Sequence, residues 1–359
     1  MSALFTPIRL RDLEVRNRVW VSPMCQYSAH HGVPDDWHLV HLGSFARGGA
    51  GLVFTEATAV VPEGRISPED TGIWNDEQQA AWTRIAAFVR DRGATPGMQL
   101  AHAGRKASTR APWLGRGPVP DDAGGWRPVA PSALAFPGLR DDPRALEHDE
   151  VAALPDAFAA ATRRAVEAGF EAVEVHAAHG YLLHTFLSPL SNRREDEYGG
   201  SFEGRTRLLL DVVRAVRGAL GEARPVAVRL SATEWTDGGW TVEDSVKLAP
   251  LLTEAGADLV DCSSGGNVAD ATIPVGPGYQ VELARRVRAD GGIRTGAVGM
   301  ITEPEQAEQI VADGSADVVL LARALLRNPH WAFAAAHELG VPVGGGVDWP
   351  DQYLRAVPS

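Results

Sequence analysis

Eight short apolar runs, rich in Val, Ile and Leu, recur along the chain, and amphipathic stretches separate them. Their limits are Val19–Met24, Gly51–Val60, Pro96–His102, Ala172–His179, Val226–Ala232, Leu259–Gly265, Thr295–Ile301 and Val318–Arg323. Runs that are apolar throughout, rather than at every second residue, are typical of strands in a parallel sheet covered on both faces. The pattern therefore predicts eight parallel strands.

Helices are predicted between these runs. Apolar residues at helical spacing mark Asp76–Arg92, Glu150–Ala168, Arg205–Leu220, Val242–Ala255 and Glu303–Ala312, and several of these segments end at a glycine, a common helix stop. A strand and a helix that alternate about eight times indicate an α/β fold of the (β/α)₈ barrel type. An open doubly wound sheet would need a glycine-rich phosphate turn after its first strand, and SPMCQYSA at that place is not one.

The length of 359 residues suits a single barrel domain, which we expect to span residues 1–359. Residues 103–149 do not fit the repeat, because they contain many Pro, Gly, Trp and Asp residues. A loop of this length in a compact fold is usually functional or forms a small subdomain. We predict that it leaves the third strand and caps the mouth of the barrel.

The formal net charge is −12, from 34 Lys and Arg residues against 46 Asp and Glu residues. This balance argues against a nucleic-acid-binding protein and against attraction to an anionic membrane surface. The chain has two cysteines, Cys25 and Cys262, which excludes a disulfide framework and an iron–sulfur cluster. We see no signal peptide and no run of about 18 apolar residues, and we expect a cytoplasmic protein.

Polar residues gather at the carboxyl ends of the runs, where barrel enzymes carry their active sites. They include Cys25, Tyr27, Gln99, Lys106, His176, His179, Tyr181, Arg229, Gly299 and Arg323. A glycine-bearing loop after the seventh run and a short helix start at Ala322–Leu326 predict the usual phosphate site of a barrel. Lys106 and Arg229 indicate an anionic ligand, or a negative charge that develops during the reaction. No cluster of carboxylates converges, so we expect no metal ion.

The pair His176 and His179 allows three interpretations. The two side chains could bind zinc in a metal-dependent hydrolase, but the third ligand would have to come from elsewhere in the chain. They could be structural histidines with satisfied hydrogen bonds. They could also be two donors that hold a substrate oxygen, with Tyr181 nearby as a proton donor.

Several segments of the sequence also resemble those of a known family. The segments SPMCQYSA, GLVFTEATAV, QLAHAGRKA, EVHAAHGYLLHTFLSPLSNRREDEYGGSFEGR and AVGMI resemble those of the Old Yellow Enzyme family of FMN-dependent ene-reductases. The likeness runs from Leu4 to Arg355, and its long segment is highly specific. Cys25 followed by Tyr27 resembles the thermophilic-like branch, since the yeast and plant branches usually carry Thr at the first of these positions.

The resemblance implies a role for each side chain. The flavin would be held by Pro23, Met24, Cys25, Ala57 and Gln99, with Cys25 beside its reactive edge, and by Arg229 and Lys106 at its N1/O2 side. The FMN phosphate would be held by Gly299, Ala322 and Arg323. The substrate would be held by Tyr27, Lys106, His176 and His179, and by Arg355 reaching in from a neighbouring subunit. Tyr181 would be the proton donor.

The resemblance also implies the reaction and the partners. NADPH or NADH would reduce the flavin, and an α,β-unsaturated carbonyl, maleimide or nitro compound would then accept a hydride at its β-carbon. Tyr181 would protonate the α-carbon. The protein would be a homodimer or homotetramer, with residues 340–359 at the subunit interface.

Two positions depart from the family pattern. Ala322 stands where the family usually has Gly, and Ala would be strained there if the position needed a positive φ. The C-terminus lacks the Trp that often follows the arginine corresponding to Arg355. A flavin-binding protein without turnover is a further alternative, whereas related flavoproteins of the dienoyl-CoA reductase and amine dehydrogenase type carry a cysteine cluster that this chain lacks.

Overall fold

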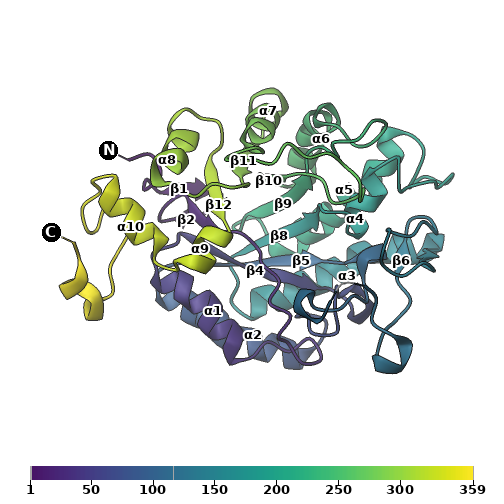
Figure 1. Ribbon diagram of the computed structural model, residues 1–359, viewed down its shortest axis with the longest axis horizontal. Helices are drawn as coiled ribbons and strands as arrows, with labels where there is room; N and C mark the ends of the chain where they lie inside the picture. The colour runs from purple at the N-terminus through teal and green to yellow at the C-terminus, as the bar shows by residue number, and fades with distance from the viewer. Residues whose placement is uncertain (1, 116, 359) are drawn as a thin grey trace.

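The computed structural model describes residues 2–115 and 117–358. Its barrel strands are β3 (Val19–Val21), β4 (Leu52–Ala59), β5 (Thr95–Ala101), β8 (Ala172–Ala177), β9 (Val226–Ser231), β10 (Leu259–Ser263), β11 (Arg294–Ala297) and β12 (Val318–Leu321). They form a closed, parallel barrel in the order β10-β11-β12-β3-β4-β5-β8-β9 (Figure 1). Each strand lies within a predicted apolar run or begins one residue before it, and the predicted barrel is confirmed.

Helices surround the strands (Figure 1). Those on the outside of the barrel are α1 (Asp36–Arg47), α2 (Asp76–Asp91), α3 (His148–Glu167), α5 (Phe202–Leu220), α6 (Val242–Ala255), α7 (Val281–Gly291) and α8 (Pro304–Ala312). Shorter helices follow two of the strands and end the fold: α4 (Leu182–Leu187), α9 (Arg323–Arg327) and α10 (Trp331–Glu338). The five predicted outer helices are present, whereas α1 and α7 were not predicted.

The amino-terminal end of the barrel is closed by a hairpin that the sequence did not predict. Strands β1 (Ile8–Leu10) and β2 (Leu13–Val15) pair antiparallel, and their apolar side chains pack with the first residues of β4, β8, β10 and β12. This plug buries the lower end of the barrel. The opposite, carboxyl end of the strands is therefore the end that can open to ligands.

The excursion after β5 contains a short pair of parallel strands, β6 (Val129–Ala130) and β7 (Arg144–Ala145). Two of its parts, around Arg110 and around Phe136, line a cavity together with Tyr27 and Tyr181 from the barrel loops. The excursion therefore forms an outer wall of the barrel mouth, as the sequence predicted for residues 103–149.

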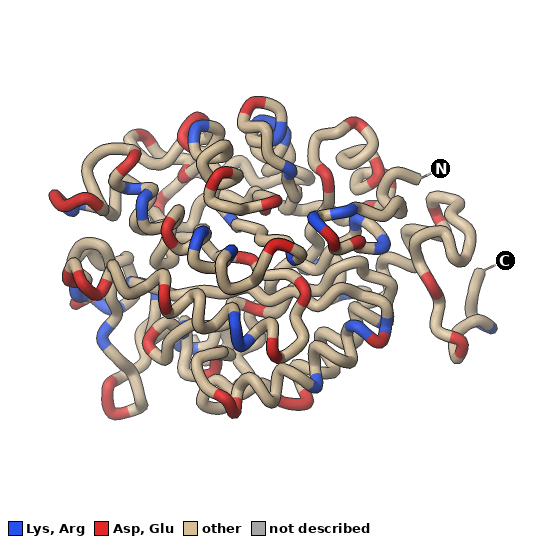
Figure 2. The backbone as a smooth tube through the Cα atoms, turned by 180° about the vertical axis from the view of Figure 1, so that it is seen from behind, with Lys and Arg blue, Asp and Glu red and all other residues tan. Residues whose placement is uncertain are grey.

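The C-terminal segment projects from the barrel on the side away from β6 (Figure 1). It is anchored by Trp349, whose ring stacks on Phe333 of α10 with 4.4 Å between centroids, and it ends in a short 3-10 helix, Asp351–Ala356. Acidic and basic residues are interspersed around the fold (Figure 2). Within the described ranges, no helix is long and apolar enough to cross a membrane.

Candidate active site

Strand register brings the predicted flavin residues side by side. Gln99 on β5 pairs with Ala57 on β4 and with Glu174 on β8, and His176 on β8 pairs with Arg229 on β9. A register shift in β4 just before Ala57 turns this end of the strand relative to its neighbour. The four neighbouring strands thus bring these residues together near their carboxyl ends.

These side chains surround an inner cavity of about 310 Å³ at the carboxyl end of the barrel. Its lining consists of Ser22, Pro23, Cys25, Tyr27, Ala57, Gln99, His176, His179, Tyr181, Arg229, Val298 and Ala322. Ten of these twelve residues were named from the sequence as site residues; Ser22 and Val298 were not. The cavity therefore collects groups from seven strand ends in one place.

The two histidines meet at this cavity, with ring centroids 5.2 Å apart and planes at 84°. The backbone N–H of Ala178 donates to Nδ1 of His176, so the proton of the neutral ring sits on Nε2. Nε2 of His179 lies 2.7 Å from the hydroxyl of Ser263 on β10. Burial, followed by the charge of Arg229, lowers the pKa of both rings well below the ordinary value. Both imidazoles are therefore neutral at physiological pH.

Tyr181 packs against the same pair. Its ring stands edge to face with that of His176, with centroids 5.0 Å apart. Burial raises the pKa of Tyr181 well above its ordinary value, with Cys25 as the next cause. Burial also raises the pKa of the Cys25 thiol. The phenol and the thiol both keep their protons at neutral pH, and each can donate one.

Below the cavity lies a buried polar network. Arg229 pairs with Asp261 (Nε to Oδ2, 2.9 Å) and donates to Ser22, while the Gln99 amide donates to Glu174 over 2.7 Å. Burial, then the charge of Asp261, raises the pKa of Glu174 to about 8. Glu174 therefore holds a proton at neutral pH, and Asp261 with Arg229 forms a neutral pair. Neither carboxyl was named as a site residue from the sequence.

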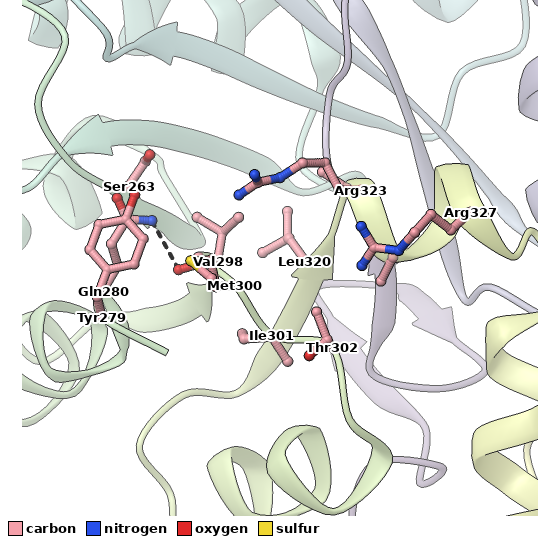
Figure 3. Close-up of a pocket in the computed structure, with 13 residues that line it drawn as sticks. Ser263, Tyr279, Gln280, Val298, Met300, Ile301, Thr302, Leu320, Arg323 and Arg327 are labelled. Atoms are coloured by element: carbon pink, nitrogen blue, oxygen red, sulfur yellow. Dashed lines mark hydrogen bonds between the residues drawn. The ribbon is translucent and has the colours of Figure 1, made fainter. Parts of the chain in front are cut away.

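A second cavity, of about 260 Å³, adjoins the first, and Val298 and Ala322 line both. Figure 3 shows Arg323 and Arg327 of α9 on one side of it, with Tyr279 and Gln280 on the other. Gln280 is fixed by a hydrogen bond from its amide to the carbonyl oxygen of Val298 over 3.0 Å. Two guanidinium groups at one end of an otherwise partly apolar cavity suit a phosphate. Arg327 was not predicted.

The backbone at this phosphate-sized cavity explains one glycine and one alanine. Gly299 has φ +120°, and a Cβ there would lie 2.7 Å from Nε2 of Gln280, so only glycine fits. Ala322 has φ −118°, outside the left-handed region. Ala322 therefore does not need the positive φ that would favour glycine at this position.

Three residues named from the sequence lie elsewhere. Met24 packs against the main hydrophobic core and Lys106 lines the outer cavity beyond Tyr27, and neither lines the inner cavity. Arg355 is exposed in the C-terminal 3-10 helix and lines neither cavity of its own chain. Their assigned roles stay predictions.

A family model described as the NADH:flavin oxidoreductase / NADH oxidase family matches residues 3–341. The chain belongs to this family. It is an oxidoreductase, and the family confirms the prediction of an FMN enzyme that uses a nicotinamide reductant and resembles Old Yellow Enzyme. The alternative of a flavin protein without turnover is set aside.

Relatives and solved structures agree with this assignment. An NADPH dehydrogenase of Listeria monocytogenes serotype 4b (strain CLIP80459) is 44% identical, and the match covers 99% of each chain. An Old Yellow Enzyme homologue from Zymomonas mobilis superposes with a TM-score of 0.78 at 29% identity, over 99% of both chains. A 2-naphthoyl-CoA reductase has a TM-score of 0.84 at 25% identity, and the match covers 95% of this chain and 52% of that one.

The residues of the two adjoining cavities fit FMN. The larger cavity carries an amide, a guanidinium and a thiol around a space of about 310 Å³, and the smaller one carries Arg323 and Arg327. A flavin ring in the first would place its phosphate near the second. Among the described residues, no group of three or more His, Cys, Asp or Glu side chains could hold a metal ion.

Proposed function

We propose that the protein reduces the C=C bond of activated alkenes, namely α,β-unsaturated carbonyl, maleimide and nitro compounds, with NADPH as reductant. The observation that carries the proposal is the neutral pair His176 and His179 beside Tyr181, at the wall of a flavin-sized cavity. This trio combines two donors for one substrate oxygen with one proton donor.

The imidazole pair polarises the alkene. Nε2–H of His176 is free to donate, because Nδ1 already accepts from Ala178. When Ser263 donates to Nε2 of His179, the Nδ1–H of that ring is free as well. Each donor aimed at the oxygen on which charge develops can lower the barrier by about 3 kcal/mol. The β-carbon then becomes electrophilic.

Bound FMN supplies the hydride that moves from NADPH to this β-carbon. Cys25, Ala57 and Gln99 would hold the ring, and Arg323 with Arg327 and the backbone at Gly299 would hold the phosphate, because these residues line the two adjoining cavities. Arg229, which lines the same cavity, would stabilise the negative charge that the ring gains on reduction. Tyr181 donates its phenolic proton to the α-carbon and regains one from solvent, and its raised pKa keeps the proton in place until that step.

We further propose a homo-oligomer in which residues 340–359 contact a second copy. Support comes from exposed apolar side chains in this segment, Val343 and Leu354, and from exposed Arg355 beside them in sequence. Arg355 would then reach a neighbouring substrate site. Both cysteines are free, which suits a reducing cytoplasm.

Isotope transfer tests the proposed reaction. NADPH carrying deuterium at the transferable C4 position, with 2-methylcyclohexenone in unlabelled buffer, should give a saturated ketone with deuterium at the β-carbon alone. The same reaction with unlabelled NADPH in D₂O should place deuterium at the α-carbon. A product reduced at the carbonyl, or no saturated ketone, would contradict the proposal.

A further inference from the structure

An outer cavity of about 540 Å³ lies beyond the inner one, and Tyr27 and Tyr181 line both. Its wall is largely apolar and aromatic: the lining includes Ile66, Pro112, Phe136, Pro137 and Leu139. A substrate held at the histidine pair can extend past these two tyrosines into this space. The residues that line the outer cavity are therefore placed to contact the part of a substrate that lies beyond the reacting bond.

The charges in this wall are of one sign. Among its described lining residues, Lys106 and Arg110 are the basic ones and none is acidic, and both are cations when protonated. Within the described ranges neither side chain forms an ion pair, although the chain as a whole has a net charge of −12. A partly buried cation without a counter-ion is costly, so this pairing of two cations favours an anion between them.

Asp70, a buried carboxyl that contacts the lining residue Ile66, does not serve as that counter-ion. Asp70 lies behind the wall, where the backbone N–H of Ile66 and the hydroxyl of Ser67 donate to it. Burial raises the pKa of Asp70 to about 8, so it is mostly protonated at neutral pH. Protonated Asp70 therefore does not neutralise the positive charge of Lys106 and Arg110.

Lys106 is held at the junction of the two cavities. Its ammonium donates to the carbonyl oxygens of His179 and Gly266 and lies 4.1 Å from the ring centroid of Phe136. Two of its three protons are engaged, which leaves one donor. Burial, then the charge of Arg105, lowers the pKa of Lys106 to about 7, and a bound anion would reverse this effect. Arg110 lies on the exposed rim of the same cavity.

We propose that the outer cavity binds an anionic group on the activated alkene itself, a carboxylate joined to the reacting bond by an aromatic or short apolar spacer, and that Lys106 and Arg110 select it. The inference rests on the proposed function and narrows its substrate class. The diphosphate of NADPH offers the same anionic chemistry, so the experiment has to separate these two sources.

The test compares 3-(4-carboxyphenyl)prop-2-enal with its neutral twin cinnamaldehyde, at pH 6 and low ionic strength. The protein should reduce the carboxylate with a kcat/KM about ten-fold higher, the gain expected of a charge-assisted hydrogen bond, and the ratio should fall as salt is added. K106M and R110Q should each lower the ratio toward one. A ratio of one or below in the unaltered protein would overturn the proposal.

Lys247 provides a matched control. It is the other lysine of the chain, it too lies over an aromatic ring (3.8 Å from the Phe202 centroid), and it lines none of the three cavities. K247M should keep the ten-fold ratio. If K247M lowered the ratio as much as K106M, overall charge rather than the outer cavity would explain the preference, and the proposal would fail.

Two further arms distinguish the sources of failure. If neither aldehyde is reduced, the proposed alkene reduction itself is wrong, and not only the proposed preference for an anionic substrate. If K106M and R110Q slow flavin reduction by NADPH but not by neutral N-benzyl-1,4-dihydronicotinamide, and leave the aldehyde ratio unchanged, the cations serve the dinucleotide and the proposal is overturned. If K106M does not fold, R110Q replaces it in the comparison of the two aldehydes. The dissociation constants of 4-hydroxybenzoate and 4-hydroxybenzamide for the unaltered protein then provide a second measurement, and we expect the benzoate to bind more tightly.

Discussion

The hydroxyl of Ser263 lies 2.7 Å from Nε2 of His179 and joins the end of β10 to the loop that follows β8. Of the two ring nitrogens, this contact occupies Nε2 and leaves Nδ1 for a ligand. If the serine donates, the neutral ring must carry its proton on Nδ1. Ser263 thereby selects the tautomer that can donate to a substrate oxygen.

Ser263→Ala should therefore weaken ligand binding without unfolding the site. The dissociation constant of a phenolic ligand for the FMN-loaded protein, read from the flavin spectrum, should rise by about ten-fold, the typical loss of a hydrogen bond to a charged group. Ser264→Ala is the control, because Ser264 bonds to Gln280 and not to a histidine. Equal binding by both variants would contradict the role of Ser263.

Tyr181→Phe should separate the two half-reactions. The phenol is the expected proton donor, and the loss of a positioned acid typically costs about 100-fold or more in rate. Reoxidation of the reduced protein by an enone should slow by that factor, whereas reduction by NADPH should hardly change. Stopped-flow absorbance measures both rates. An unchanged rate of reoxidation would assign the proton donor elsewhere.

Gly299→Ala and Ala322→Gly should have opposite consequences for FMN affinity. The first adds a Cβ at φ +120° against Gln280 and should weaken FMN binding by the apo-protein and lower the melting temperature. The second acts at φ −118° and should leave FMN binding unchanged, while lowering stability by about 0.5–1 kcal/mol. Quenching of FMN fluorescence gives both affinities. Tighter FMN binding by Ala322→Gly would show that alanine strains the site.

Glu174→Gln should flatten the dependence of stability on pH. In the folded chain Glu174 keeps its proton up to a pKa of about 8, whereas the unfolded chain loses it near 4.5. The stability from this group is fully present below about pH 4.5 and is lost as the pH rises to about 8, by at most about 1.4 kcal/mol per pH unit. Urea unfolding between pH 5 and 8 should show a shallower decline in the variant. Parallel curves would mean that Glu174 is ionised when folded.

The barrel was predictable because each strand is an uninterrupted apolar run, and because Val242–Ala255 and its counterparts keep helical spacing between glycine stops. The hairpin β1–β2 was not predictable, because each of its strands has three residues, too few to show a recognisable hydrophobic pattern. Helix α7 was also missed, because arginines and acidic residues interrupt its apolar stripe.

The residues that line the inner cavity were predictable from residue type at the strand ends and from the family resemblance, and their roles stay predictions. Glu174 and Asp261 were overlooked, although each is an acid inside an apolar run, the same signal that singled out Arg229. The position of Lys106 in the outer cavity could not be read from sequence, because it depends on how loops 73 and 160 residues away in the chain fold back to offer their carbonyl oxygens.

An anaerobic titration of the purified protein tests the central claim most directly. The protein, loaded with FMN, should show flavin absorbance that bleaches when NADPH is added and returns when cyclohexenone follows. This result would establish the cofactor, the reductant and the reaction class in one cuvette. A protein that takes up no FMN, or flavin bands that bleach with NADPH and stay bleached with the enone and with a maleimide, would contradict the account.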